Sequence, residues 1–339
     1  MRPLVTAVVV SYADPGAAVA ATRSLLAQSH PPCEVLLIDN DPEGAPGRAG
    51  LFEPAVQVLC PGANIGYTGA ANLAAQRARG DWLFFLNPDA IAAPDCLERL
   101  LEAVDAPEVA IVGAQVLLPD GRVNAGANPV NIAGVSWSGG YGSPREHGPA
   151  RDVAAVSGAA LMVRRERFDE VGGLCPHFFL YVDDTDLAWR VRLGGGRVRY
   201  CPQAVVVHDY EFDKGSAKWF YLERNRAWAL LCNLRVSTLV LLAPLLAATE
   251  AAVLVRAARE GWLREKLRAW AYLPTHARAL LAWRGRVQAG RRVSDGQVLA
   301  LFAGGVQTGL LEDPPPAWVN AALELYRRCL LRVLRAPQQ

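Results

Sequence analysis

The first 120 residues alternate between two hydrophobic patterns. Short continuous apolar runs, rich in Val, Leu and Ile, are typical of strands buried on both faces, and Ala-rich stretches with spaced apolar positions are typical of helices. Helices are predicted over residues 15–29, which begin with a proline, and over residues 64–80, which Gly80 closes. Strands are predicted over residues 4–12, 33–40, 55–60 and 81–90. Strands that alternate with helices form βαβ units, so we expect an α/β fold with a mainly parallel sheet.

Polar residues stand at the ends of these strands. Tyr12 ends the first strand, Asp39 lies at the end of the second, and the fourth stops abruptly at "NPDA", which contains Asp89. The carboxyl ends of parallel strands share one edge of a sheet, and open α/β sheets bind ligands at that edge. Asp89 is therefore a candidate metal or ligand residue. Because it follows Pro88, ordinary turn chemistry is the alternative explanation.

A second group of carboxylates lies in "YVDDTDLAWRVR", where Asp183, Asp184 and Asp186 precede or open a predicted helix. N-capping by Asp183 or Asp184 is one explanation, which needs a single carboxylate and contributes ~1 kcal/mol. Adjacent carboxylates also repel each other and raise one pKa, which suits a general base. The next predicted strand ends in His208, which is either structural or a metal ligand or proton shuttle.

Residues 120–153 are rich in Gly, Asn, Ser and Pro. This composition predicts a long loop or an irregular subsite, with Trp137 and Tyr141 as candidate contacts. Loops of this length inside a domain are usually functional or disordered.

The segment 236–255 is the most apolar stretch of the chain, with Glu250 as its single charge. Its length would allow it to span a bilayer, but Pro244, Glu250 and the Arg-rich chain that follows oppose a spanning helix. We expect an interfacial or re-entrant helix whose flanking basic residues meet anionic lipid headgroups. A buried helical hairpin that packs on the sheet domain is the alternative.

Charge is unevenly distributed along the chain. Residues 1–211 carry 16 Arg, no Lys and 24 acidic residues, whereas residues 212–339 carry 19 basic and 9 acidic residues. A basic half favours an anionic partner surface. No zinc-finger, RNP or other nucleic-acid motif occurs, so we expect no nucleic-acid partner and favour an anionic membrane surface.

Cysteine usage and the N-terminus bear on location. The seven cysteines are scattered and form no CxxC pair, which favours reduced thiols in the cytosol over disulfides or a zinc site. The N-terminal "MRPLVTAVVVSY" is typical of a first strand and lacks the features of a signal peptide. We expect a cytoplasmic protein that is peripheral at the cytoplasmic face of the cell membrane.

Several enzyme classes lack their signatures in this sequence. No G-x-G-x-x-G, G-x-x-x-x-G-K-[ST], G-x-S-x-G or H-E-x-x-H occurs, which disfavours dinucleotide-binding Rossmann enzymes, P-loop enzymes, serine hydrolases and zincins. The first strand-to-helix turn, "SYADPGAAV", has no Lys and one Gly, which disfavours a nucleotidyltransferase.

Five ordered blocks of the chain resemble family 2 glycosyltransferases, specifically the rhamnosyltransferase-like branch. The blocks are "VVVSYAD", "LLIDN", "NIGYTGAAN…GDWLFFLNPDA", "SGAALMVRRERFDEVGGL…FFLYVDDTDLAWRVRLGG" and "YCPQAVVVHDY…KWFYLERNRAWALL". The resemblance implies a GT-A fold, the nucleotide-diphospho-sugar transferase fold, in residues 1–231. Residues 232–339 are then a helical, basic, membrane-associating C-terminal region.

The resemblance also implies roles for individual residues. The general base of the family's E-D pair falls on Asp184, with Asp183 as the first member of the pair. The last carboxylate of the D-x-D metal motif falls on Asp89, and a histidine that completes metal or diphosphate binding falls on His208. The cofactor implied is Mg²⁺ or Mn²⁺, which prefer oxygen ligands. The implied substrate-binding residues are Tyr12 beside the nucleotide base, Asp39 on its ring N–H, Asn64, Gly66, Asn72, Asn87, Asp186 and Arg190.

The function implied is sugar transfer with inversion from a nucleoside-diphosphate sugar, such as dTDP-rhamnose or another dTDP- or UDP-sugar. The acceptor implied is a cell-envelope or exopolysaccharide glycan, and the basic, apolar C-terminal half favours a lipid-linked one. The sequence departs from the family in lacking a two-carboxylate D-x-D and the Q-x-x-R-W of processive synthases. We therefore expect non-processive addition. A catalytically inactive nucleotide-sugar-binding or membrane scaffold subunit is the alternative.

Overall fold

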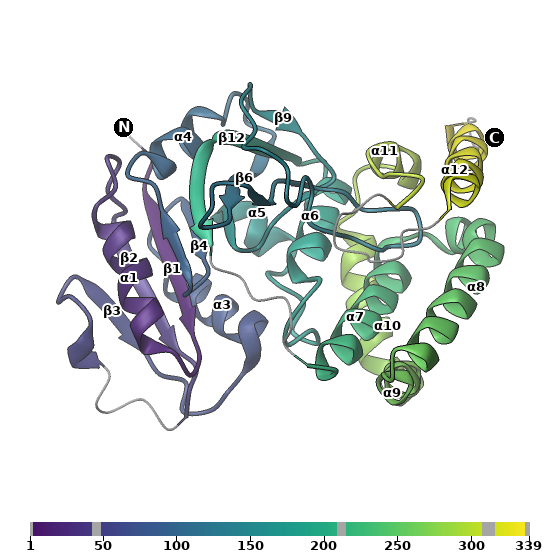
Figure 1. The fold of residues 1–339 in the computed structure, drawn as a ribbon, viewed down its shortest axis with the longest axis horizontal. Coiled ribbons are helices and arrows are strands. Elements are labelled where there is room, and N and C mark those ends of the chain that lie inside the picture. Colours follow the sequence, from purple (N-terminus) through teal and green to yellow (C-terminus); the bar gives the residue numbers. More distant parts are fainter. Residues whose placement is uncertain (1–2, 43–48, 209–214, 307–315, 336–339) are drawn as a thin grey trace.

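A mixed ten-stranded sheet forms the centre of the molecule (Figure 1). The computed structural model describes residues 3–42, 49–208, 215–306 and 316–335. The sheet path runs β3-β2-β1-β4-β11-β6-β12-β5, and β1 pairs in parallel with both β2 and β4. β11 is antiparallel to its neighbours β4 and β6. The strands are β1 (Val5–Ser11), β2 (Glu34–Asp39), β3 (Val56–Leu59), β4 (Trp82–Leu86), β5 (Ala90–Ala92), β6 (Val109–Leu117), β11 (Ala160–Arg164) and β12 (Arg197–His208).

Helices cover both faces of this sheet, which explains why its strands are apolar throughout. Alternate residues of β1 enter different cores: Val5, Ala7 and Val9 pack on one face, and Val8 and Val10 on the other. The first face is covered by α1 (Pro15–Leu26) and α4 (Cys96–Glu102), and the second by α3 (Gly66–Arg77), α5 (Arg165–Glu170) and α6 (Asp183–Leu193). A strand buried on both faces needs no polar side, and this confirms the predicted α/β architecture.

One detail of the predicted helices is wrong. The helix predicted over residues 64–80 ends at Arg77, and Ala78, rather than Gly80, is its C-cap. A Cβ atom at Gly80 would lie 2.4 Å from the backbone nitrogen of Thr6. Gly80 is therefore required where the chain passes close to β1, and it does not end the helix.

The segment 120–153 is largely irregular, as predicted. It contains only the short strands β7 (Val123–Ala125), β8 (Ala127–Asn128) and β9 (Arg151–Asp152), and β8 pairs with β10 (Ala155–Val156) in a small separate sheet. Trp137 is half-buried and Tyr141 is exposed.

Helices follow the sheet domain and lie beside it (Figure 1). Trp228 and Leu230 of α7 belong to the same hydrophobic core as α3 and α6. α7 also runs through residue 231, where the sequence placed the end of the sheet domain. The helices are α7 (Ala217–Asn233), α8 (Val236–Arg259), α9 (Leu263–Thr275), α10 (Ala277–Ala289), α11 (Asp295–Leu299) and α12 (Ala317–Arg335).

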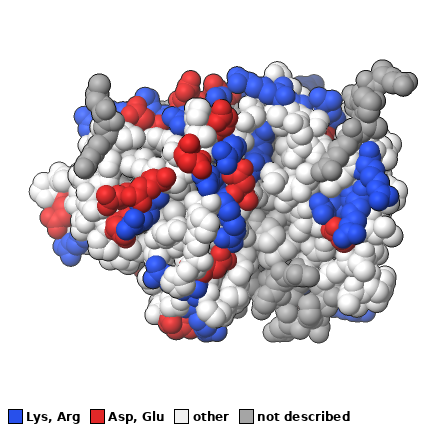
Figure 2. Space-filling view, turned by 90° about the horizontal axis from the view of Figure 1, so that it is seen from above, with Lys and Arg blue, Asp and Glu red and all other residues white. Residues whose placement is uncertain are grey.

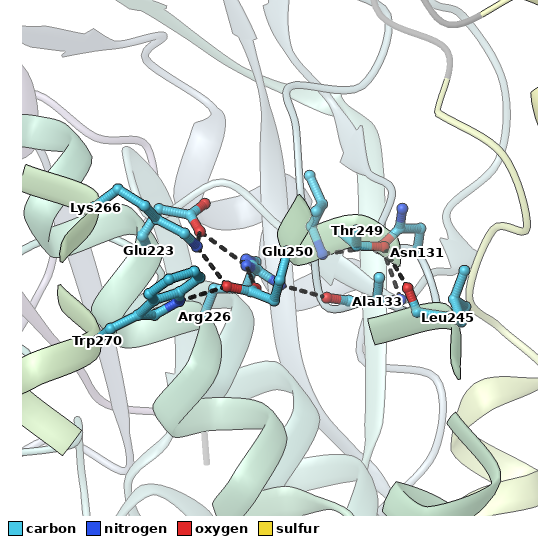
Figure 3. A network of polar contacts seen from close by, with 10 residues as sticks. Asn131, Ala133, Glu223, Arg226, Leu245, Thr249, Glu250, Lys266 and Trp270 are labelled. Carbon is cyan, nitrogen blue, oxygen red and sulfur yellow. Dashed lines mark hydrogen bonds and ion pairs between the residues drawn. The ribbon is translucent and has the colours of Figure 1, made fainter. Parts of the chain in front are cut away.

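Four charged side chains join the first three of these helices (Figure 3). Arg226 of α7 pairs with Glu223 at 2.8 Å and also with Glu250 of α8. Lys266 of α9 is 1% exposed and pairs with Glu250 at 2.7 Å and with Glu223. We call these four residues the α7–α9 ion network. It stabilises the packing of α7, α8 and α9, and Arg226 also donates to the carbonyl of Ala133 at 3.1 Å, in the irregular segment.

The apolar segment 236–255 lies within α8, which is not a buried helix. Among the described residues α8 is the one helix long and apolar enough to cross a bilayer, and 17% of its most apolar stretch is buried within the protein. The predicted alternative of a buried hairpin is therefore wrong, because most of the helix surface lies outside the core.

Candidate active site

The tips of β4 and β12 bring together three residues from distant parts of the chain. Nε2 of His208 lies 2.9 Å from Oδ1 of Asp89 and 3.4 Å from Nδ2 of Asn87. The backbone N–H of Asn87 donates to the carbonyl of Ala159 at 2.9 Å, which fixes the start of this turn. His208 is buried. β5 pairs antiparallel with the end of β12, and His208 is opposite Ala90 in this pairing. Because Ala90 follows Asp89 directly, the pairing brings His208 next to Asp89.

Asp89 and His208 could hold a divalent ion between them. Two ligands at right angles on one octahedral ion, each at about 2.1 Å, lie about 3.0 Å apart. The separation of 2.9 Å is compatible with that geometry, and it is also the length of a direct hydrogen bond between the two side chains. No group of three or more His, Cys, Asp or Glu side chains suited to a metal occurs in the described part of the chain. An ion here would therefore need substrate oxygens to complete its coordination, as Mg²⁺ commonly does with phosphates.

The loop before α6 has an unusual backbone. Phe179, Tyr181 and Val182 have φ values of 66°, 68° and 63°, in the left-handed region that side chains rarely adopt. Asn225 of α7, fully buried, donates from Nδ2 to the carbonyls of Leu180 and Tyr181, both at 2.8 Å. Such strain persists where the surrounding structure holds it and is common at functional sites.

This loop delivers Asp183 and Asp184 to the first turn of α6. The N-cap of α6 is Val182, and no side chain caps the helix. The explanation of the two aspartates as N-caps is therefore wrong. Oδ2 of Asp184 accepts the backbone N–H of Gly158 at 2.9 Å, and its Oδ1 accepts the backbone N–H of Thr185 at 2.6 Å. These bonds fix the direction of the Asp184 carboxylate.

The two aspartates lie in a site that disfavours their charged forms. Burial and then the charge of Asp184 raise the pKa of Asp183 to about 8. Burial also raises the pKa of Asp184, partly offset by the bonds from Gly158 and Thr185. The Tyr67 hydroxyl is affected in the same way, since burial and the two carboxylates raise its pKa. No Lys or Arg pairs with Asp183 or Asp184 among the described residues. Two neighbouring carboxylates can thus share a proton near neutral pH, which suits proton transfer.

A single pocket of about 270 Å³ joins the two clusters. Its lining includes Asn87 and His208 as well as Asp183 and Asp184. The sequence did not indicate several other residues that line it, which are Tyr67, Asn124, Asn128, Ser138, Ser157 and Gly158. Three of these belong to the irregular segment 120–153, where the sequence predicted a subsite but proposed Trp137 and Tyr141 as its contacts, and neither of those two residues lines this pocket. The pocket wall is therefore rich in amides and hydroxyls, which suit sugar hydroxyl groups.

The remaining strand-end residues lie along the same edge of the sheet. Ser11 of β1 is opposite Asp39 of β2, and Tyr12, which follows, is 56% exposed. Asp39 is buried and its Oδ1 accepts the N–H of Asp41 at 3.3 Å. Asn64 accepts a bond at 3.0 Å from Asn40, the residue after β2. The structure thus places Tyr12, Asp39 and Asn64 at the sheet edge but outside the pocket of the paired aspartates.

Gly66 and Asn72 on α3 support the strained loop from the other side. Gly66 has φ 73°, and a Cβ there would lie 2.5 Å from Cδ2 of Phe179, so no larger residue fits. Asn72 exchanges two hydrogen bonds of 2.9 Å with the backbone of Leu174. The side chain of Asn72 therefore bonds to protein, and Gly66 serves close packing.

Asp186 and Arg190 lie behind the pocket. Both are buried, and Nε of Arg190 binds Oδ2 of Asp186 at 2.8 Å. Asn233 of α7 donates to the other carboxylate oxygen at 2.9 Å. Arg190 also donates to the carbonyls of Val171 and Gly173, at 2.8 and 2.7 Å. The structure thus uses both side chains to hold α6 against the preceding loop and α7.

Comparison with protein families and solved structures agrees with this arrangement. The family model described as "Glycosyl transferase family 2" matches residues 6–172, a range that includes Asp89 and ends before Asp183. The N-acetylglucosaminyl-diphospho-decaprenol L-rhamnosyltransferase of Mycobacterium tuberculosis is 32% identical over 212 residues, which cover 55% of this chain and 69% of that protein.

Two solved structures share the fold. The crystal structure of GalNAc-T7 with UDP, GalNAc and Mn²⁺ has a TM-score of 0.57 at 15% identity, over 68% of this chain and 48% of that chain. The mannosyltransferase PcManGT from Pyrobaculum calidifontis, in complex with GDP-Man and Mn²⁺, has a TM-score of 0.52 at 18% identity, over 100% of this chain and 89% of that chain. These likenesses confirm the expected GT-A fold.

Proposed function

The chain belongs to glycosyl transferase family 2, and we propose that it moves a sugar from a nucleoside-diphosphate sugar to a glycan acceptor with inversion at the anomeric carbon. One observation carries the proposal: a pocket lined by a pair of carboxylates without a cation is also lined by His208, whose Nε2 lies 2.9 Å from Oδ1 of Asp89. An inverting transferase needs one base on the acceptor side and a stabiliser of the leaving group on the donor side. The pocket offers a candidate for each.

On the donor side, Asp89 and His208 would hold Mg²⁺ or Mn²⁺ together with the diphosphate. When bound, a divalent ion would neutralise the charge that develops on the leaving nucleoside diphosphate. Asn87 would bind next to it. Tyr12 and Asp39, at the ends of β1 and β2, would bind the nucleotide base, with Asn64 and Gly66 bordering the sugar that carries it. The Mn²⁺ and nucleotide ligands of the two structural neighbours support this arrangement.

On the acceptor side, Asp184 would accept the proton of the attacking hydroxyl. The backbone N–H groups of Gly158 and Thr185 orient its carboxylate. Asp183 would hold a proton beside the ionised Asp184, since burial and the charge of Asp184 raise the pKa of Asp183 to about 8. The acceptor oxygen then attacks the anomeric carbon while the bond to the diphosphate breaks. Asn72, Asp186 and Arg190 would position this machinery without touching the substrate.

The M. tuberculosis relative suggests the substrates. Its name describes transfer of L-rhamnose to a diphospho-decaprenol acceptor. We propose rhamnose or a related hexose as the sugar, dTDP or UDP as its carrier, and a lipid-linked cell-envelope or exopolysaccharide glycan as the acceptor. Addition is non-processive. Residues 1–231 would perform the transfer at the cytoplasmic face of the membrane, and residues 232–339 would associate with that membrane.

Nucleotide binding tests the proposal without knowledge of the acceptor. Calorimetry would compare dTDP, UDP, GDP and CMP, with and without Mg²⁺ or Mn²⁺, for the wild type, Asp39→Ala and Asp89→Ala. We expect one diphosphate to bind in a metal-dependent way, with about tenfold or greater weakening in Asp89→Ala. Asp39→Ala should lower the preference for one base. The matched control is Asp105→Ala, which removes a half-exposed carboxylate before the amino end of β6, at the opposite edge of the sheet.

The opposite result has a clear meaning. If the folded wild type binds none of these nucleotides, the transferase proposal fails, and the inactive scaffold subunit becomes the better description. If binding is equal in Asp89→Ala and the wild type at every metal concentration, the assignment of Asp89 as a metal ligand fails.

A further inference from the structure

The outward side of α8 is apolar along its length. Its exposed positions recur every three or four residues, so they share one side of the helix. We call this surface the α8 outer face, and it is formed by Val236, Val240, Pro244, Ala247, Ala251 and Val255. Val240 and Val236 are 66% and 64% exposed. No charged residue occurs on this side of the helix between residues 236 and 255.

The one charge of that stretch points inward. Glu250 belongs to the α7–α9 ion network, and its Oε2 also accepts Nε1–H of Trp270 at 2.6 Å (Figure 3). A surface helix of a water-soluble protein normally buries its apolar side and turns its charges to water. α8 has the reverse arrangement over this stretch, which indicates that its outer face meets an apolar medium.

Basic residues surround the α8 outer face. Arg235 and Arg259 lie at its two ends, and Arg264 begins the neighbouring helix α9. All three are exposed and form no ion pair within the described ranges. Figure 2, seen from above, shows Lys and Arg side chains, with acidic side chains among them, at the end of the molecule where the C-terminal helices lie. An apolar strip with a basic rim complements the interface of an anionic bilayer.

Aromatic residues add to this match. Trp270 and Leu267 of α9 are 38% and 48% exposed. Trp219 of α7 stacks on Trp262, between α8 and α9, with ring centroids 4.6 Å apart. Trp residues favour the boundary between lipid and water, where the ring has both apolar and polar surroundings.

We propose that α8 lies in the plane of a lipid bilayer, with the α8 outer face among the acyl chains and the basic rim at anionic headgroups. This inference rests on the proposed function and deepens it by identifying the surface that meets the membrane. The α7–α9 ion network opposes a spanning orientation, because a helix surrounded by lipid would expose Glu250 to the acyl chains.

Helix α7 packs against the pocket loop and also against α8 and α9. Tyr221 of α7 stacks on Phe179 in the strained pocket loop, with centroids 5.5 Å apart. The same helix carries Glu223 and Arg226, which bind α8 and α9. A short, packed connection therefore links the α8 outer face to the loop that positions Asp183 and Asp184. An acceptor anchored in the bilayer would reach the pocket from this side.

Vesicle flotation of the full chain tests the inference. Vesicles of phosphatidylcholine alone would be compared with vesicles of phosphatidylcholine and phosphatidylglycerol. We expect the wild type to bind the anionic vesicles more strongly, and the double variant Val240→Asp, Ala247→Asp to bind them about tenfold or more weakly. The matched control places the same charges on α10, as Ala282→Asp and Ala289→Asp, two exposed positions away from the α8 outer face. The control should bind like the wild type.

Each other outcome overturns the inference. If the α8 double variant binds vesicles like the wild type, another surface meets the lipid. If the wild type ignores vesicles and forms a dimer that the double variant abolishes, the α8 outer face is an interface between protein copies. If alkaline carbonate fails to extract the wild type from cell membranes, α8 is inserted and not in-plane. Nucleotide binding, measured on the same samples, reports separately on the proposed function and should be unchanged in both double variants.

Discussion

The first turn of α6 and the α7–α9 ion network each hold two buried or partly buried carboxylates, yet their environments change the carboxylate pKa in opposite directions. Asp183 and Asp184 have no cation partner in the described structure, and burial raises the pKa of both. Burial would also raise the pKa of Glu250, but Arg226 and Lys266 outweigh it and hold that pKa at about 2. The first pair retains a proton near neutral pH, and the second stays charged.

The presence or absence of a cation partner distinguishes carboxylates that stabilise packing from carboxylates suited to proton transfer. A buried carboxylate that is paired with cations stabilises packing, and it does so in full above its unfolded pKa of about 4.5. That stabilisation is lost as the pH falls towards 2. A buried carboxylate without a cation costs stability once it ionises, and it is retained where proton transfer is useful. The sequence alone shows all of these residues as acidic, and only the fold shows which of them have partners.

The largest effect is expected for the Asp184→Asn variant. Asn keeps the shape of the side chain but cannot accept a proton, so sugar transfer should fall by about 10²–10⁴-fold. Binding of the nucleoside diphosphate should stay the same, because Asp184 lies on the acceptor side. Transfer would be measured with the donor that calorimetry identifies. Glu250→Gln provides the contrast, since it removes a buried carboxylate that has no role in the reaction. Equal activity of Asp184→Asn and the wild type would contradict the assignment of the base.

The next effect concerns stability. Arg226→Met removes one cation and leaves Glu223 and Glu250 with Lys266 alone, so the free energy of unfolding should fall by about 3–5 kcal/mol. Chemical denaturation measures this value. The outcome that contradicts the structural role is a change smaller than about 0.5 kcal/mol, the size expected for exposed pairs.

A smaller effect is expected for Asp183→Asn and depends on pH. Folding raises the pKa of Asp183 from 3.8 to about 8, so the folded state keeps a proton that the unfolded state releases in this range. The free energy of unfolding should therefore fall as the pH rises from about 4 to about 8. Asp183→Asn removes this dependence and should exceed the wild type in stability by about 1–3 kcal/mol on the alkaline side. Parallel pH dependences of the two proteins in thermal unfolding would show that Asp183 ionises normally.

The smallest effect is expected for Arg99→Ala, which breaks ion pairs on the protein surface in place of the buried ion pairs of the α7–α9 ion network. Arg99 pairs with Asp95 and Glu102 at 3.1 and 3.0 Å, and all three side chains are about half exposed. Solvent screens such pairs, so Arg99→Ala should change the free energy of unfolding by about 0.5 kcal/mol or less. A loss comparable to that of Arg226→Met would mean that burial does not distinguish the two sets of ion pairs.

The sequence predicted the sheet well because strands buried on both faces have no polar positions. β1, β2 and β4 formed where apolar runs predicted them, and their parallel register placed Asp39 and Asp89 at the same edge. Helix ends were less predictable. Gly80 is needed because the chain there passes close to the backbone of Thr6, a residue distant in sequence, and not because it ends a helix. Local patterns carry no information on such contacts.

The candidate site was predictable in part. The sequence indicates Asp183, Asp184, Asp89 and His208 as candidates; Asp183, Asp184 and His208 line one pocket, and Asp89 lies 2.9 Å from His208. The buried partners of Asp186 and Arg190 were not predictable, because Asn233 lies 47 residues away and reaches α6 only through the packing of α7. The sequence likewise could not show that Glu250 points inward, because its direction depends on how α7 and α9 pack around it.

The most direct test of the central claim is a carbon-13 NMR titration of the aspartate and glutamate carboxyl groups. Asp183→Asn and Asp184→Asn would assign the signals of the pocket pair, and Glu250→Gln the signal of the network. We expect an aspartate signal of the pair to titrate near pH 8 and Glu250 to stay ionised until about pH 2. If both pocket aspartates titrate near the ordinary value of about 3.9, they are not poised to take a proton, and the proposed base is wrong.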